Sequence, residues 1–237
     1  MAAACNVAIL SNADWGATSE SAAVDAAKRE WDAEVAQLES AIDRAQPHGR
    51  ILELACGTGI WTQRLAPLSE HLTAVDTSPE VLELNRRRVG LDRVEYVQRD
   101  IFRWIPEETY DFIFFGFWLS HVPPRRFDRF WELLGTALRP GGSVFFLDTL
   151  FQRDAIVRVS REEDLEVRQL IDGRRFRIIK VFFEADSLQK RLKSLGWDGY
   201  VRSTNRYFIY GLQQPDVCLL YTSPSPRDRG CYRMPAS

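Results

Sequence analysis

Two glycines separated by one residue follow a short apolar run in the stretch ILELACGTG, residues 51–59. Glycine takes backbone conformations closed to other residues, and it lets a ligand approach the chain without a Cβ in the way. A dinucleotide site would need a third glycine three residues after Gly59, beside a helix N-terminus that faces a pyrophosphate. That position is Thr62, and the bulky Trp61 precedes it. The turn therefore predicts a small-molecule site that does not hold a pyrophosphate.

An acidic residue follows the next strand-like run. Asp76 lies seventeen residues beyond Gly59 and is followed by Thr77, Ser78 and Pro79. A serine cap with proline at the first helical position is a good helix start. Because Ser78 already provides the cap, Asp76 is available to accept hydrogen bonds from both hydroxyls of a ribose.

A second acid, Asp100, ends the third strand-like run and precedes Ile101 and Phe102. A carboxylate accepts hydrogen bonds from an exocyclic amine, and apolar neighbours can cover the faces of a flat base. Any one such acid is weak evidence, since strand ends often carry capping aspartates. The glycine turn and two acids in order, at one edge of a sheet, favour a nucleoside site more strongly.

The elements that position these residues form an alternating series. Strand-like and helix-like segments follow one another from residue 50 to residue 147, which argues for a doubly wound parallel α/β sheet with right-handed crossovers. In such a sheet the ligand lies at the carboxyl ends of the strands, where the glycine turn and both acids fall. The expected strands are 50–55, 72–76, 94–99, 112–116 and 143–147, the expected helices are 61–67, 79–88 and 127–138, and Gly141 and Gly142 make the last turn.

The segments that flank this series have other patterns. Apolar residues at helical spacing predict an amphipathic helix over 21–44. The dipeptide Asp172-Gly173 is a strong hairpin signal between two β-rich runs, 165–171 and 174–183. Its basic residues, Arg174, Arg175, Arg177 and Lys180, are interpreted as a solvated strand face. A helix over 185–195 and two antiparallel edge strands, 200–203 and 206–210, complete the expected elements.

The full ordered set resembles the class I S-adenosylmethionine-dependent methyltransferases. Besides the glycine turn, Asp76 and Asp100, it includes Tyr110-Asp111 before the fourth strand and the stretch LRPGG before the fifth. The match covers residues 20–211. The resemblance implies a Rossmann-like sheet of seven mostly parallel strands whose last strand is antiparallel. It also implies methyl transfer from S-adenosylmethionine to oxygen or nitrogen of a small-molecule acceptor, with release of S-adenosylhomocysteine.

The same resemblance implies how the cofactor lies along the sheet edge. Gly57 and Gly59 would lie against its methionine part, Asp76 would hold the ribose, and Asp100 with Ile101 would frame the adenine. Phe117, just after the fourth strand, would line the passage between cofactor and acceptor. The cofactor-binding residues expected on this basis are Glu53, Ala55, Gly57, Gly59, Trp61, Asp76, Thr77, Asp100, Ile101 and Phe117.

Methyl transfer from an activated donor needs mainly an oriented nucleophile and exclusion of water. If a base is used, His121 is the candidate, because it lies just past the fourth strand and takes up a proton near neutral pH. The alternative is a histidine bonded at the start of the next helix. Asp148, at the end of the fifth strand, is a second candidate, and either residue could bind the acceptor instead. Trp31 and Trp118 are the expected acceptor contacts, although aromatic residues at such spacing are more often part of a core.

The 237 residues fit one domain at 1–217, with a helical lid at 1–48 and a hairpin insertion at 149–184. The 31 basic and 33 acidic residues nearly cancel, and no apolar run is long enough for a bilayer, so neither nucleic acid nor a membrane is an expected partner. No cysteine spacing suits a metal site. We expect a cytoplasmic monomer or homodimer. Residues 218–237 resemble a translated sequencing adapter, as in an assembled metagenome sequence, and are set aside.

Three rival functions use the same residues. A nicotinamide-dependent oxidoreductase is disfavoured by Thr62 and by the absence of a Tyr-x-x-x-Lys pair. A cofactor-binding regulator without catalysis is disfavoured only weakly by the complete set of cofactor residues. A nucleic-acid methylase is disfavoured because the fourth strand ends in the stretch GFWL, which differs from the Asn/Asp-Pro-Pro-Tyr/Phe of exocyclic-amine methylases, and because the charge is balanced.

Overall fold

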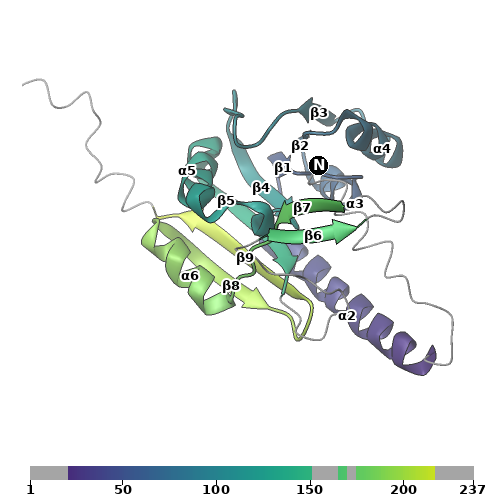
Figure 1. Cartoon of the computed structure of the whole chain (residues 1–237). Helices are drawn as coiled ribbons and strands as arrows, with labels where there is room; N and C mark the ends of the chain where they lie inside the picture. The colour runs from purple at the N-terminus through teal and green to yellow at the C-terminus, as the bar shows by residue number, and fades with distance from the viewer. Residues whose placement is uncertain (1–20, 151–164, 170–174, 217–237) are drawn as a thin grey trace, which may run out of the picture.

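The computed structural model describes residues 21–150, 165–169 and 175–216. It holds a seven-stranded sheet in the order β3-β2-β1-β4-β5-β9-β8 and a separate two-stranded sheet of β6 and β7 (Figure 1). The strands are β1 (Arg50–Leu54), β2 (His71–Asp76), β3 (Val94–Gln98), β4 (Tyr110–Gly116), β5 (Leu138–Thr149), β6 (Leu165–Gln169), β7 (Arg175–Ile179), β8 (Trp197–Ser203) and β9 (Phe208–Pro215). The helices are α2 (Ser21–Ala45), α3 (Ile60–Leu65), α4 (Pro79–Val89), α5 (Phe127–Ala137) and α6 (Ala185–Ser194), with short 3-10 turns η1 (Ala66–Leu68), η2 (Leu119–His121) and η3 (Pro124–Arg126).

The direction of the strands confirms the predicted fold class. Strands β1 to β5 pair in parallel, whereas β9, the last strand along the chain, pairs antiparallel with both β5 and β8. Strands β6 and β7 pair antiparallel, as the hairpin signal predicts, although the Asp172-Gly173 turn itself lies outside the described residues. The segments 1–20 and 217–237, including the adapter-like tail, also lie outside them.

The start of β5 differs from the predicted turn. Tyr110 of β4 pairs with Leu138, but Phe112 already pairs with Ser143, so β5 advances five residues while β4 advances two. The extra residues include Gly141, whose φ of 83° favours glycine. The two glycines predicted to form a turn before the strand therefore lie in an irregularity inside it.

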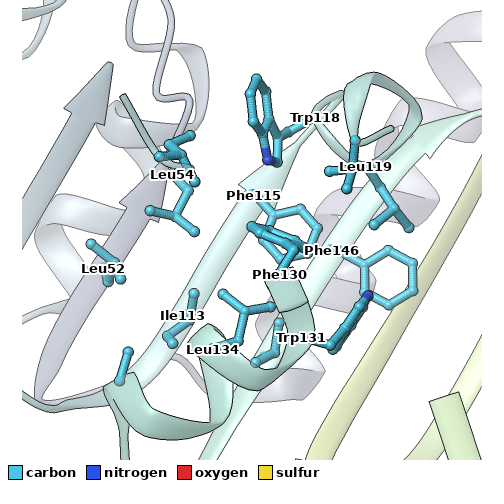
Figure 2. Packing of buried hydrophobic residues seen from close by; sticks show 14 of the residues in the cluster. Leu52, Leu54, Ile113, Phe115, Trp118, Leu119, Phe130, Trp131, Leu134 and Phe146 are labelled. Carbon is cyan, nitrogen blue, oxygen red and sulfur yellow. The ribbon is translucent and has the colours of Figure 1, made fainter. Parts of the chain in front are cut away.

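Apolar side chains cover both faces of the central strands, as a doubly wound sheet requires. One cluster joins one face of β1, β4 and β5 to α5 and α6, and Figure 2 shows Phe115, Phe130, Trp131 and Phe146 packed together at its centre. The other joins the opposite face to α2, α3 and α4. Neighbouring residues of β4 alternate between the two clusters, since successive side chains of a strand point to opposite faces.

Helix α2 is held to the domain by its second half. Leu38, Ala41 and Ile42 are fully buried, and the Glu34 carboxylate accepts hydrogen bonds from the backbone N–H groups of Arg206 and Tyr207. The opposite end of α2 projects away from the sheet (Figure 1). No helix in the described ranges is long and apolar enough to cross a bilayer.

Candidate functional site

The carboxyl ends of the central strands bring the predicted site residues to one edge of the sheet. Leu54, the last residue of β1, pairs with Val75 of β2 and with Phe115 of β4, so Ala55, directly after β1, lies between Asp76 and the end of β4. The chain order reverses between β1 and β4. This edge is therefore the topological switch point, where doubly wound sheets bind their ligands.

Two residues at the switch point have strained backbones. Among the described residues, only three that are not glycine have a positive φ, and two of them are Ala55 (53°) and Phe117 (57°), directly after β1 and β4. A side chain in this conformation costs about 1–2 kcal/mol, and such strain is concentrated at functional sites. The Phe117 N–H donates to the Leu147 carbonyl at 2.8 Å, which holds the strained turn in place. Both residues belong to the predicted cofactor set.

The two glycines of the turn have different surroundings. Both have positive φ, 55° at Gly57 and 90° at Gly59. A Cβ on Gly57 would have one neighbour within 4 Å, the Ala55 carbonyl at 3.9 Å, so the space above this glycine is open. A Cβ on Gly59 would lie 2.5 Å from the side-chain oxygen of Asn85. Gly57 thus leaves room for a ligand, whereas Gly59 leaves room for helix α4.

Asp76 connects the glycine turn to the end of β2. Its Oδ2 accepts a hydrogen bond from the Gly57 N–H and its Oδ1 accepts one from the Ser78 N–H, both at 3.1 Å. Ser78 caps α4, as predicted, because its hydroxyl accepts from the Val81 N–H. Burial raises the pKa of Asp76, and these backbone hydrogen bonds oppose the rise. Thr77 lies between the carboxylate and the cap, at the same edge.

Glu53 places a second carboxyl group below the turn. It is 1% exposed, and its Oε2 has no hydrogen-bond partner among the described residues. Burial raises its pKa to about 8; a hydrogen bond from Thr62 opposes the rise and the Asp76 carboxylate adds to it. A neutral pH therefore leaves much of this carboxyl group protonated until a cationic group approaches it.

The loops after β3 and β4 meet across the same edge. Ile101 is buried and the ring of Phe102 lies 5.4 Å from the ring of Trp118. Asp100 is exposed and its Oδ1 accepts from the Phe102 N–H, which fixes the loop. These contacts place an apolar wall beside an exposed carboxylate.

Two predicted site residues lie within packed aromatic groups. The rings of Trp61 and Phe114 are 5.7 Å apart, and Trp61 covers Gly116 in the core on the α2 side of the sheet. Trp31 contacts Phe208 at 4.7 Å, and Phe208 in turn lies 6.1 Å from Phe117. The structure thus places Trp31 in a different apolar cluster from Trp118.

A buried ion pair lies beyond the ends of β4 and β5. Lys180, just after β7, donates to the Ser120 hydroxyl at 2.7 Å and to Asp148 Oδ1 at 3.4 Å. The Ser120 N–H donates to Asp148 Oδ2 at 2.8 Å. Burial opposes ionisation of Asp148, but Lys180, His121 and these hydrogen bonds outweigh it and lower its pKa. The interpretation of Lys180 as part of a solvated face is wrong, because its side chain is 3% exposed.

His121 belongs to the same group of side chains. Its Nδ1 lies 2.7 Å from the Ile179 carbonyl, which can only accept, so the proton is on Nδ1. The Val181 N–H donates to the Ser120 carbonyl at 2.8 Å, so a second backbone segment joins the same contact. The end of β7 is therefore fixed to η2 by backbone and side-chain bonds.

Three buried polar residues were not found from the sequence alone: Ser120, Lys180 and Asn85. Lys180 stands inside the apolar run IIKVFF, and a lysine there signals a buried partner. Asn85 follows Val81 and Leu82 at helical spacing, so a polar residue occupies a core-facing position of α4. The sequence therefore contained a signal of burial for Lys180 and for Asn85, but none for Ser120.

Comparison with known proteins gives consistent matches. Residues 51–142 match a family model described as a methyltransferase domain. The solved DhpI–SAM–HEP complex matches 83% of this chain and 92% of its own chain, with 38% identity and a TM-score of 0.69. The demethylmenaquinone methyltransferase of Clavibacter sepedonicus is 36% identical over 123 residues, which are 50% of this chain and 48% of that protein. The malonyl-[acyl-carrier protein] O-methyltransferase of Bacillus anthracis is 40% identical over 81 residues, 32% of this chain and 30% of that protein. The chain spans about half or less of the length of these curated relatives.

Proposed function

The chain belongs to the S-adenosylmethionine-dependent methyltransferases, and from this premise we propose that it transfers a methyl group to an oxygen or nitrogen atom of a small molecule. The observation that carries the proposal is the match to the DhpI–SAM–HEP complex over nearly the whole of that chain. The curated relatives act on different acceptors, demethylmenaquinone in one case and a malonyl group on a carrier protein in another. The acceptor atom and the acceptor are therefore part of the proposal.

The residues at the switch point fit S-adenosylmethionine. The open space above Gly57 would take the methionine part, and the buried Glu53 oxygen, which has no partner in the described part of the chain, suits its ammonium group. Asp76 would hold the ribose, while Asp100 and Ile101 would frame the adenine. When bound, the cofactor would supply an activated sulfonium methyl group, which passes to the acceptor atom as the bond from the methyl carbon to sulfur breaks and leaves the thioether S-adenosylhomocysteine. The chain itself would orient the two reactants and exclude water. The surrounding backbone and rings would be held by the other predicted cofactor residues, Ala55, Gly59, Trp61, Thr77 and Phe117.

The acceptor would lie beyond the ends of β4 and β5. Because Nδ1 carries a proton, the His121 ring in its neutral form would carry its lone pair on Nε2, the form that a general base needs. Asp148 suits that role less, because it already accepts from Ser120, Thr149 and Lys180 and its pKa is lowered. We therefore propose His121 as the base and Asp148 as the residue that holds η2 in position.

The two tryptophans expected to contact the acceptor, Trp118 and Trp31, would lie on different sides of it. The contact between Trp118 and Phe102 supports a place for Trp118 where adenine and acceptor meet. Trp31 reaches Phe117 through Phe208, which supports a wall of the acceptor site made by α2. A lid would involve the projecting half of α2, since the other half is part of the core.

Transfer of a labelled methyl group from S-adenosylmethionine to a panel of small acceptors tests the activity. We expect transfer to at least one acceptor with an oxygen or nitrogen nucleophile, and a loss of about tenfold or more in cofactor affinity for Asp76→Ala, which removes hydrogen bonds to the ribose. Binding of S-adenosylhomocysteine without transfer to any acceptor would identify a silent binder. Unchanged affinity in Asp76→Ala would remove Asp76 from the site.

The role of His121 as the base is tested separately, by kinetics with the acceptor that the panel identifies. His121→Gln should lower kcat by about a hundredfold, because a positioned base contributes at least that much, and should leave the affinity for S-adenosylhomocysteine unchanged. The wild-type rate should also fall at acid pH, where a protonated imidazole cannot take up a proton. A variant with normal kcat would show that orientation alone suffices.

A further inference from the structure

A fully buried amide lies behind the glycine turn. Asn85 of α4 is 0% exposed, and its Nδ2 donates to the Gly57 carbonyl at 3.1 Å and to the Thr62 hydroxyl at 2.8 Å. Its Oδ1 accepts from the Tyr96 hydroxyl of β3 at 3.2 Å. An amide in this position uses both of its N–H donors and its oxygen, and it joins the turn to α3, α4 and β3.

The contact with Gly59 shows that the amide touches the rear of the turn. A Cβ on Gly59 would lie 2.5 Å from Asn85 Oδ1 and 3.2 Å from its Cα, whereas Gly57 is open. Helix α4 therefore supports the turn from the side away from the proposed ligand. The second glycine is required for this close approach, and the first for the ligand.

The same amide orders the hydroxyl group of Thr62. Because Thr62 Oγ1 accepts from Asn85 Nδ2, its own O–H remains to donate, and Glu53 is the carboxyl group that it reaches. Tyr96, Asn85, Thr62 and Glu53 thus form a series of hydrogen-bonded side chains that ends below the turn. Removal of Asn85 would free Thr62 to rotate and would release the Gly57 carbonyl.

We propose that Asn85 is a positioning residue for the cofactor: without touching it, Asn85 fixes the Gly57 carbonyl and the Thr62 hydroxyl so that the turn fits the methionine part. This inference rests on the proposed function. A purely structural amide would stabilise the domain without favouring any part of the ligand. The positioning role instead predicts a loss of affinity that depends on the methionine part.

The test compares two ligands and two buried amides. S-adenosylhomocysteine carries the amino-acid part, and 5′-methylthioadenosine lacks it. Gln213→Leu is the matched control for Asn85→Leu. Gln213 of β9 is also 0% exposed, and it donates to Gln189 of α6 and to the Tyr200 carbonyl of β8. These elements lie at the far edge of the sheet from the glycine turn. Calorimetry gives the two affinities, and urea unfolding gives the stability of each variant.

We expect Asn85→Leu to lower the affinity for S-adenosylhomocysteine by about tenfold, which corresponds to the loss of one hydrogen bond of roughly 1.4 kcal/mol. The affinity for 5′-methylthioadenosine should change less than about twofold. Gln213→Leu should lose similar stability with both affinities unchanged. If Asn85→Leu does not fold, Asn85→Asp keeps the shape, and because a carboxyl group offers at most one donor it cannot hold both the Gly57 carbonyl and the Thr62 hydroxyl, so the same loss is expected.

Equal losses for both ligands, or the wild-type affinity for S-adenosylhomocysteine in Asn85→Leu and Asn85→Asp, would overturn the positioning role. Failure of the wild-type protein to bind S-adenosylhomocysteine at all would instead overturn the proposed function. The two failures are therefore distinct.

Discussion

The proposed cofactor side and the proposed acceptor side of the sheet edge are built in different ways. On the cofactor side, backbone groups of a short stretch do most of the work: Gly57 and Ser78 donate to Asp76 across separations of nineteen and two residues. On the acceptor side, Ser120, Asp148 and Lys180 come together from residues 28 to 60 apart. A local motif fixes the first, whereas only the complete fold assembles the second.

The two sides also compensate buried acids differently. Among the residues that the structure describes, no cation forms an ion pair with Glu53, and burial raises its pKa to about 8, so that a proton neutralises it. Asp148 has Lys180 beside it, and this cation together with His121 and the backbone hydrogen bonds outweighs burial and lowers the pKa of Asp148. A carboxyl group without a cation suits a site that receives a cationic ligand, while a paired one suits a structural bond. Four predictions examine this difference, from the largest effect to the smallest.

Lys180→Met should have the largest effect, a loss of about 4 kcal/mol in the free energy of unfolding, because it leaves a buried carboxylate unpaired. Adding Asp148→Asn to this variant should recover a large part of the loss, since the uncompensated charge is then gone. Urea unfolding at neutral pH measures both. A loss below about 1 kcal/mol in the single variant would mean that the ion pair is solvated, and the contrast between the two sides would fail.

Replacement of the two glycines by alanine should separate packing from binding. Gly59→Ala should lower the free energy of unfolding by about 3 kcal/mol, since strain at positive φ adds to a clash with Asn85. Gly57→Ala should lower the free energy of unfolding by about 1 kcal/mol, from strain alone. It should also weaken the binding of S-adenosylhomocysteine, because the new methyl group would occupy part of the ligand's space. Equal losses of stability would contradict the assignment of one glycine to the ligand and the other to α4.

Glu53→Gln should change how stability depends on pH. The folded protein keeps the Glu53 proton up to a pKa of about 8, while the unfolded chain loses it near 4.5. The stabilisation is complete below the lower value and is lost as pH rises through the upper one, by up to about 1.4 kcal/mol per pH unit. The difference between wild type and Glu53→Gln, followed by urea unfolding from pH 5 to 8, should show this slope. A parallel pair of curves would mean that Glu53 is ionised in the folded state.

Ser78→Ala should have the smallest effect, a loss of about 1 kcal/mol in the free energy of unfolding, as is usual for a helix cap. The backbone N–H of residue 78 still donates to Asp76 in this variant, so the affinity for S-adenosylhomocysteine should change less than about twofold. Thermal unfolding and calorimetry measure the two quantities. A tenfold loss of affinity would show that the cap itself positions Asp76.

The sequence was sufficient for the central sheet because hydrophobic period, turn residues and the glycine motif all act locally. It also placed Asp76, Ala55 and Phe117 at the carboxyl ends of their strands, where the structure has them. It missed the contacts of Lys180 and Asn85, because a polar residue in an apolar pattern signals that a buried partner exists but does not say which residue the partner is. Their partners, Asp148 and the Gly57 carbonyl, are 32 and 28 residues away along the chain. The bulge at the start of β5 likewise depends on the pairing of β5 with β4, which the glycines at 141 and 142 permit but do not specify.

Calorimetry of the full chain against S-adenosylhomocysteine and against NAD tests the central claim most directly. The open glycine, Asp76 and the Glu53 oxygen that has no partner among the described residues predict saturable binding of S-adenosylhomocysteine. They predict no binding of NAD, because Thr62 stands where a pyrophosphate-binding turn has its third glycine. Saturable binding of NAD together with no binding of S-adenosylhomocysteine would contradict it.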